Sequence, residues 1–278
     1  MKREDIYLRD PFILPYKSTY YLYGTKGETS WGIADRFEVF KSSDLESWDG
    51  PFTAFKRPDG FWADRHFWAP EVYIYNDLFY MFASFFAEDA FRGTQILVAD
   101  NPIGPFGIHS NGPVTPKDWN CLDGSLYIDK LGKPWMVFCH EWTQIKDGTI
   151  CAIRLSDDLK NSIGDPIELF NASSVSWVKG FDGNYITDGP FLLKRKNSSL
   201  IMIWSSLCET GYALGIARAS EINGPWVNEK LPLFTDDGGH GMIFKDFNGK
   251  MQLIIHYPNV QGKERPFIIE IADSVLNK

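Results

Sequence analysis

Residues 188–206 read DGPFLLKRKNSSLIMIWSS: an acidic residue and a Gly-Pro step, followed by two apolar runs with a polar stretch between them. Short apolar runs separated by Asn and Ser predict two antiparallel strands joined by a turn. The same arrangement occurs at residues 10–25, 69–84, 123–140 and 240–257. The chain therefore contains five copies of one strand-turn-strand unit.

The spacing of these copies predicts the fold. The corresponding Pro or Gly residues are separated by 59, 54, 65 and 52 residues, at positions 11, 70, 124, 189 and 241. This leaves room for four short strands in each unit. Such a repeat predicts an all-β fold, a five-bladed β-propeller that forms a single domain over residues 1–278. Because the fifth copy is short, we expect residues around Ile6 to supply its outer strand and close the ring.

Composition excludes several classes of function. A net charge of −8 and an isoelectric point near 5.2 argue against a nucleic-acid partner. No segment has the roughly 20 apolar residues of a membrane span. The first ten residues, MKREDIYLRD, lack the apolar core of a signal peptide, so we expect a cytoplasmic protein, or a secreted or periplasmic one if a leader has been removed. The aromatic content of 15% fits rings that stack on sugars, or an aromatic-rich core.

The propeller model brings distant residues together. The first strand of each blade lies nearest the axis, so Asp10, Asp123, Asp188 and His240 should meet at one mouth of the channel. The second strands end at the same mouth, and the polar residues expected on its rim are Thr25, Ser84, His140, Ser205, Ser206 and His256. Each aspartate alone could be a turn residue. Together, beside aromatic side chains, they match the paired carboxylates of glycoside hydrolysis.

Five short motifs carry a resemblance to a known family: RDPFI at 9–13, WAPEV at 68–72, LDGSLY at 122–127, TDGPF at 187–191 and GGHG at 238–241. In this order and spacing they resemble glycoside hydrolase family 43. The resemblance implies a five-bladed propeller that hydrolyses arabinose- or xylose-containing glycans with inversion at the anomeric carbon.

The resemblance also implies roles for the acidic residues. Asp10 would be the general base, and Asp123 would tune and orient the acid. The acid position falls on Asp188, where the family usually has glutamate in a Glu-Gly-Pro motif, and the aspartate is shorter by one C–C bond of about 1.5 Å. Glu141, in CHEWTQ, is the alternative acid, and Glu71, in WAPEV, is a third candidate.

Other candidates concern ligands of the site. By resemblance, His240 could help to hold a Ca²⁺ ion or a water chain in the channel, although no cofactor is required. The candidates for sugar-stacking walls are Trp31, Phe67, Trp68, Phe85 and Trp142, any of which could instead belong to the core.

We therefore expect an exo-acting α-L-arabinofuranosidase whose partner is an arabinose- or xylose-containing oligosaccharide. The length of the chain is closer to that of compact arabinan-degrading members than to that of xylosidases with an additional C-terminal domain. A β-xylosidase or an endo-1,5-α-L-arabinanase remains open. A non-catalytic glycan-binding propeller is the alternative from another class: the Glu-to-Asp change favours it, and the presence of both Asp10 and Asp123 disfavours it.

Overall fold

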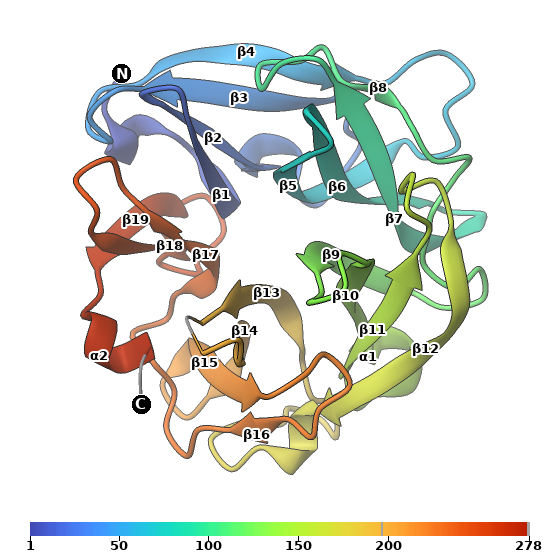
Figure 1. Cartoon of the computed structure of the whole chain (residues 1–278), viewed down its shortest axis with the longest axis vertical. Coiled ribbons are helices and arrows are strands. Elements are labelled where there is room, and N and C mark those ends of the chain that lie inside the picture. The colour runs from blue at the N-terminus through green and yellow to red at the C-terminus, as the bar shows by residue number, and fades with distance from the viewer. Residues whose placement is uncertain (196, 277–278) are drawn as a thin grey trace.

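The computed structural model, which describes residues 1–195 and 197–276, confirms the five-bladed propeller (Figure 1). Blade 1 contains β1 (Leu8–Tyr16), β2 (Thr19–Lys26), β3 (Arg36–Ser42) and β4 (Asp49–Lys56). Blade 2 contains β5 (Arg65–Tyr75), β6 (Leu78–Ala87), β7 (Ala90–Ala99) and β8 (Gly107–Ile108). Blade 3 contains β9 (Cys121–Ile128), β10 (Pro134–His140), β11 (Thr149–Leu155) and β12 (Ser162–Asn171). Blade 4 contains β13 (Asp188–Lys194), β14 (Leu200–Cys208), β15 (Gly211–Ala219) and β16 (Val227–Asn228), and blade 5 contains β17 (Gly239–Lys245), β18 (Met251–Tyr257) and β19 (Arg265–Glu270).

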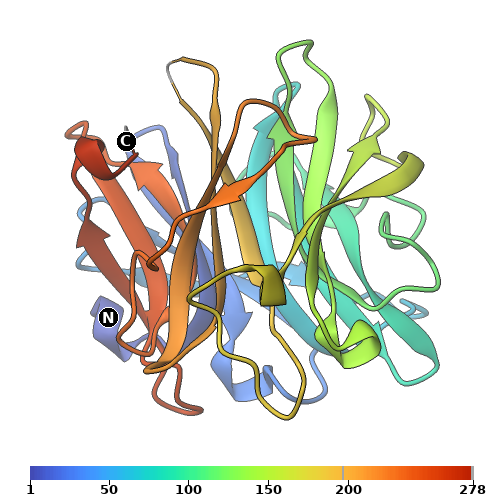
Figure 2. The same cartoon turned by 90° about the horizontal axis from the view of Figure 1, so that it is seen from below.

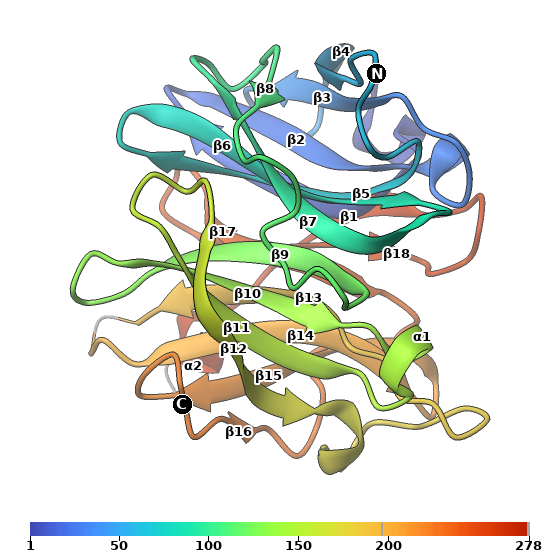
Figure 3. The same ribbon diagram turned by 90° about the vertical axis from the view of Figure 1, so that its right-hand side faces the viewer.

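The blades stand side by side around the channel, with β1, β5, β9, β13 and β17 innermost (Figure 1). In side view the connections between strands lie at the two ends of the channel (Figure 2). The short helix α1 (Trp142–Ile145) lies at one of these ends (Figure 3). The middle strands are buried on both faces, which explains their continuous apolar runs. In β10, for example, residues 136–139 are fully buried. Cys139 and the other cysteines are free thiols.

The fifth blade differs from the prediction. Among the described residues it has three strands, and the segment around Ile6 does not add a fourth. Instead the N-terminal 3₁₀ helix η1 (Arg3–Asp5) packs beside β19, where the Arg265 Nε donates a hydrogen bond to the Glu4 carbonyl at 3.0 Å. The C-terminal helix α2 (Asp273–Leu276) joins blade 5 to blade 4 through Arg218, whose guanidinium donates to the Val275 carbonyl at 2.9 Å. The termini therefore close the ring by packing, without strand exchange.

A β-bulge interrupts the innermost strand of every blade at the same point. The bulge residue has a positive φ angle in each blade: 50° for Asp10, 43° for Ala69, 59° for Asp123, 53° for Gly189 and 43° for His240. Bulges of this kind bend the strand and redirect a side chain. They explain why side chains at the start of the innermost strands converge on the axis.

The bulges correct one equivalence expected from the sequence. In blade 4 the bulge residue is Gly189, and Asp188 is the residue before it, paired with Ser205. Asp188 therefore corresponds in position to Arg9 and not to Asp10. Glycine takes the left-handed conformation without cost. A Cβ at Gly189 would also lie 2.6 Å from the His240 ring, so this position has no room for a side chain.

Candidate active site

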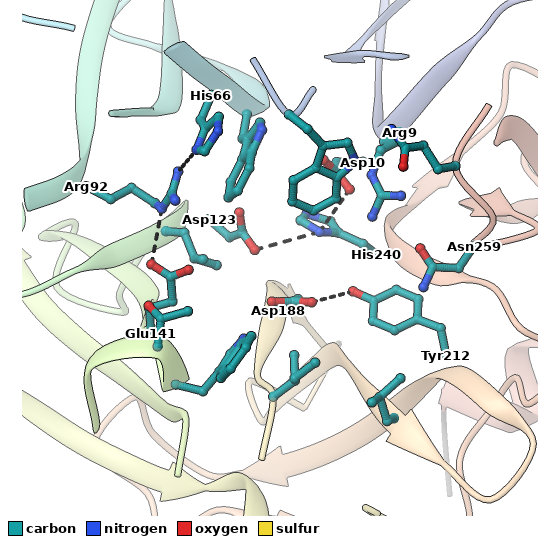
Figure 4. Close-up of a pocket in the computed structure, with 18 residues that line it drawn as sticks. Arg9, Asp10, His66, Arg92, Asp123, Glu141, Asp188, Tyr212, His240 and Asn259 are labelled. Atoms are coloured by element: carbon teal, nitrogen blue, oxygen red, sulfur yellow. Dashed lines mark hydrogen bonds and ion pairs between the residues drawn. The ribbon is translucent and has the colours of Figure 1, made fainter. Parts of the chain in front are cut away.

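A pocket of about 520 Å³ opens at the end of the channel that carries α1 (Figure 4). It brings together most of the predicted site residues: Asp10, Trp31, Trp68, Asp123, Glu141, Trp142, Asp188 and His240. The lining residues come from all five blades. Residues that the sequence did not single out complete the wall: Arg9, His66, Arg92, Leu122, Thr143, Ile186, Leu207, Tyr212, Asn259 and Gln261.

Two of the predicted stacking residues are not in the pocket. Phe67 and Phe85 are 3% and 0% exposed and contact each other edge to face at 4.8 Å between ring centroids. Both belong to an aromatic cluster with Phe37, Phe55 and Phe61. They are core residues, because a sugar cannot reach a fully buried ring. Trp31, in contrast, is 54% exposed at the rim.

The side chains at the ends of the second strands support the floor of the pocket. Ser84 accepts a hydrogen bond from the Asp123 N–H, and Ser205 accepts one from the His240 N–H, both at 2.8 Å. His256 accepts one through Nδ1 from the Asp10 N–H at 3.2 Å. These three side chains are fully buried, so they hold the bulges in place from below instead of lining the rim as expected.

Asp10 is surrounded by groups that favour its ionised form. His240 Nδ1 lies 3.2 Å from Asp10 Oδ1, and the Thr25 hydroxyl donates to Oδ2 at 2.6 Å. Burial alone would raise the pKa of Asp10, but the charges of His240 and Arg9 and the contact with His256, whose Nδ1 lies 3.4 Å from Asp10 Oδ1, outweigh it and hold the pKa well below its usual range. An anionic carboxylate of this kind can accept a proton from water.

Asp123 and Asp188 have the opposite environment. Burial, with the nearby charge of Asp10, raises the pKa of Asp123 well above its usual range, and the Gly189 N–H donates to its Oδ2 at 2.9 Å. Burial, together with the charge of Asp123, raises the pKa of Asp188 to about 7, although His240 and Tyr212 oppose the rise. The site therefore combines an ionised carboxylate, that of Asp10, with two carboxyl groups, those of Asp123 and Asp188, whose raised pKa values let them carry a proton near neutral pH. Acid-base catalysis requires one group of each kind.

Glu141 is buried in the wall of the pocket and is not an exposed residue of the rim. Its Oε2 forms an ion pair with Arg92 Nε at 3.1 Å, and the other end of this guanidinium lies 3.2 Å from His66 Nδ1 (Figure 4). The Arg92 cation also lies over the Trp68 ring, 3.9 Å from its centroid. His66 stacks on Trp68 at 4.6 Å, and its pKa is lowered to about 4 by burial and by Arg92. Glu141, Arg92, His66 and Trp68 thus form one rigid wall.

Glu71 lies below the floor of the pocket. It is two residues beyond the bulge at Ala69, and its carboxyl accepts a hydrogen bond from the Tyr73 hydroxyl. Burial raises its pKa to about 8. Glu71 does not line the pocket, so this carboxyl has no contact with the space where a substrate would bind.

The channel below the carboxylates is lined in part by apolar side chains, whereas a Ca²⁺ ion beside His240 stays a prediction. Ca²⁺ takes six to eight oxygen ligands, which can include waters. Two residues beyond the bulges lie the buried side chains of Phe12, Phe191 and Met242, and Phe12 contacts Phe191. Within residues 1–195 and 197–276, no group of three or more His, Cys, Asp or Glu side chains is arranged to hold a metal. The same part of the chain contains no helix that is long and apolar enough to cross a membrane.

Comparisons with known proteins agree with this geometry. A crystal structure described as an endo-arabinase from Bacteroides thetaiotaomicron is 43% identical and has a TM-score of 0.91, with 98% of this chain and 96% of that chain covered. The extracellular exo-α-(1→5)-L-arabinofuranosidase of Cellvibrio japonicus is 26% identical over all of this chain and 82% of its own length. The extracellular endo-α-(1→5)-L-arabinanase 1 of Bacillus subtilis is 24% identical over 84% of this chain and 71% of its own length.

The chain is also similar to enzymes named for xylan. A crystal structure described as an endo-1,4-β-xylanase from Bacteroides thetaiotaomicron is 28% identical and has a TM-score of 0.81, with 98% of this chain and 92% of that chain covered. The family model described as glycosyl hydrolases family 43 matches residues 6–269, nearly the whole chain. The protein is therefore an inverting glycoside hydrolase that belongs to glycosyl hydrolases family 43.

Proposed function

We propose that this enzyme hydrolyses α-L-arabinofuranosidic bonds and releases single arabinofuranose units from the ends of arabinose-containing glycans. The observation that carries the proposal is the pocket that residues of all five blades line, with the carboxylates at its floor. We infer that a pocket of about 520 Å³ at the mouth of the channel holds the end of a chain. The similarity to the Cellvibrio arabinofuranosidase supports the choice of sugar and the exo mode.

In the proposed mechanism, Asp10 removes a proton from a water molecule, which attacks the anomeric carbon in a single step. Asp188 gives its proton to the departing glycosidic oxygen at the same time. Inversion leaves room for the water between the two groups, so we expect acid and base about 6.5–9.5 Å apart when substrate is bound. Asp123 is close enough to both to act on them through its charge, and its hydrogen bond from the Gly189 N–H fixes the backbone next to Asp188.

Glu141 is a weaker candidate for the acid. Its Oε2 is engaged in the ion pair with Arg92 Nε, and this contact favours a role in the wall of the pocket. We propose instead that Glu141, Arg92 and Trp68 bind the sugar, with Trp31 and Trp142 contacting units further out. The aromatic faces would cover C–H groups of the substrate while the charged groups bind its hydroxyls.

Endo-acting hydrolysis of arabinan is a second candidate, favoured by the 43% identity to the Bacteroides endo-arabinase. The two modes differ in their products. We would incubate the enzyme with linear α-1,5-arabinan and follow the products over time. Arabinose as the first product supports exo action, whereas a series of oligosaccharides would overturn it. Aryl β-D-xyloside, tested beside aryl α-L-arabinofuranoside, decides the choice of sugar, and Asp10→Ala serves as the inactive control.

A further inference from the structure

Tyr212 is in contact with the residue proposed as the general acid. It is the second residue of β15, and its side chain is almost fully buried in the wall of the pocket. The Tyr212 hydroxyl donates a hydrogen bond to Asp188 Oδ2 at 2.8 Å (Figure 4). No other side-chain hydrogen bond to the Asp188 carboxyl is found in the described part of the chain.

Three neighbours fix the position of the Tyr212 ring. The ring stacks on His256, with 5.6 Å between the centroids and 14° between the planes. The Tyr212 N–H donates to Asp237 Oδ1 at 3.1 Å. Gly239 leaves the space that the ring occupies, because a Cβ there would lie 2.8 Å from Tyr212 Cε1. The ring therefore cannot swing away from Asp188 without moving β17 or β18.

The same contacts connect the acid to the base. His256, on which Tyr212 stacks, also accepts the hydrogen bond from the Asp10 N–H. Tyr212 and His256 thus form one stacked pair that contacts the Asp188 carboxyl at one end and the Asp10 backbone at the other. A change in the position of this pair would move Asp188 relative to Asp10.

We propose that Tyr212 is a positioning residue that holds the short side chain of Asp188 in the orientation needed to protonate the leaving group. This inference rests on the proposed role of Asp188 as the acid. The hydrogen bond to Oδ2 leaves Oδ1 to carry the proton. When the glycosidic C–O bond breaks, this proton passes to the departing oxygen, and the new Asp188 carboxylate keeps the hydrogen bond from Tyr212. Asp10 takes one proton from the attacking water, so the two carboxyl groups exchange roles as proton carriers, and solvent restores them.

The charges around Asp188 predict how its pKa changes when the hydrogen bond from Tyr212 is lost. Asp123 on β9 and Asp10 on β1 disfavour the Asp188 anion, whereas His240 on β17 and the Tyr212 hydroxyl favour it. Without the hydroxyl, the pKa of Asp188 should rise further. A role in overall stability alone would not alter the pH profile in this way.

The test is the pH profile of Tyr212→Phe, a change that keeps the ring and its stacking. With arabino-oligosaccharide as substrate, we expect the alkaline decline of kcat to move to a pH about one unit higher. Hydrogen bonds to a carboxylate commonly shift its pKa by this order. We also expect kcat at pH 6 to fall about tenfold, since a misplaced catalytic group costs up to about a hundredfold. KM and the hydrolysis of an aryl arabinofuranoside, which needs little acid assistance, should change little.

Tyr257→Phe is the matched control. Its hydroxyl also donates to a carboxylate, Asp236 Oδ2 at 3.2 Å, but outside the pocket. Its pH profile should match that of the wild type.

Two results separate this inference from the proposed function. If Asp188→Asn shows the loss expected of an acid while Tyr212→Phe keeps the wild-type limb and kcat, the positioning role is wrong and the acid assignment stands. If Asp188→Asn hydrolyses oligosaccharide at the wild-type rate, the acid assignment itself fails, and the present inference fails with it.

Discussion

Replacing Asp188 by asparagine should separate the chemistry of leaving-group protonation from every other role of this residue. Asparagine has nearly the same shape and its amide oxygen can still accept the hydrogen bond from Tyr212, which is 2.8 Å long in the native site. What it lacks is the proton. We therefore expect the fold and substrate binding to persist while acid catalysis is lost.

The size of the effect follows from the environment of the carboxyl. With its pKa raised to about 7 by burial and by Asp123, Asp188 is protonated in about nine-tenths of molecules at pH 6 and about one-tenth at pH 8. Wild-type hydrolysis of oligosaccharide should accordingly fall as the pH rises through 7. A general acid contributes about 10²- to 10⁴-fold, so Asp188→Asn should lose that much with an oligosaccharide at pH 6.

The assay compares two substrates that differ only in the leaving group. An arabino-oligosaccharide releases a sugar hydroxyl and needs the acid, whereas 4-nitrophenyl α-L-arabinofuranoside releases a stable anion. Asp188→Asn should retain most aryl activity, without the alkaline decline, and lose most oligosaccharide activity. Equal loss with both substrates would refute the reasoning, as would the appearance of this selective pattern in Glu141→Gln instead.

Three further predictions test the other parts of the site. Asp10→Asn should lower turnover of both substrates by about 100-fold or more, because every substrate needs the activated water, and an unchanged melting temperature would confirm that the fold survives. Arg92→Met should lower the free energy of unfolding by about 3–5 kcal/mol in urea titrations, since it leaves the Glu141 carboxylate buried and unpaired; an added Glu141→Leu should restore much of the loss. Phe85→Ala should lower the free energy of unfolding by about 3–5 kcal/mol, because it truncates a core side chain. Trp31→Ala should raise KM and leave stability unchanged. The reverse pattern would contradict the assignment of Phe85 to the core and Trp31 to the rim.

The repeats in the sequence predicted the architecture well, because each blade is built from local hairpins whose strands and turns have clear patterns. The same repeats predicted that residues far apart in the chain would meet at one mouth. The closure of the ring was not predictable in detail. Whether the N-terminal segment pairs as a strand or packs as a short helix depends on contacts with β19 that involve residues more than 250 positions away.

Two of the pocket residues that the sequence did not single out share a place in the fold. Arg92 and Tyr212 lie near the starts of β7 and β15, which are the third strands of their blades. A third strand runs in the same direction as the first, so its start lies at the same mouth. The order of the strands in a blade therefore predicts both residues at this mouth. Their burial against Trp68 and His256 could not be predicted, because stacking depends on the angle between neighbouring blades.

The offset of Asp188 from the bulge explains how similar carboxylates acquire different roles. Asp10 sits at a bulge, where its carboxylate faces His240 and Thr25 and its backbone N–H is held by His256. Asp188 is one residue before the bulge of its own blade; His240 acts on it through its charge, and the side-chain hydrogen bond that its carboxyl receives within the described residues comes from the neutral hydroxyl of Tyr212. Burial is common to both, but the compensating positive charge is concentrated on Asp10, so the two pKa values separate in opposite directions. An aspartate at position 189 would clash with His240, because its Cβ would lie 2.6 Å from the imidazole ring. The one-residue shift therefore allows a symmetric ring of blades to hold two carboxyl groups with opposite pKa shifts, as the proposed pair of acid and base requires.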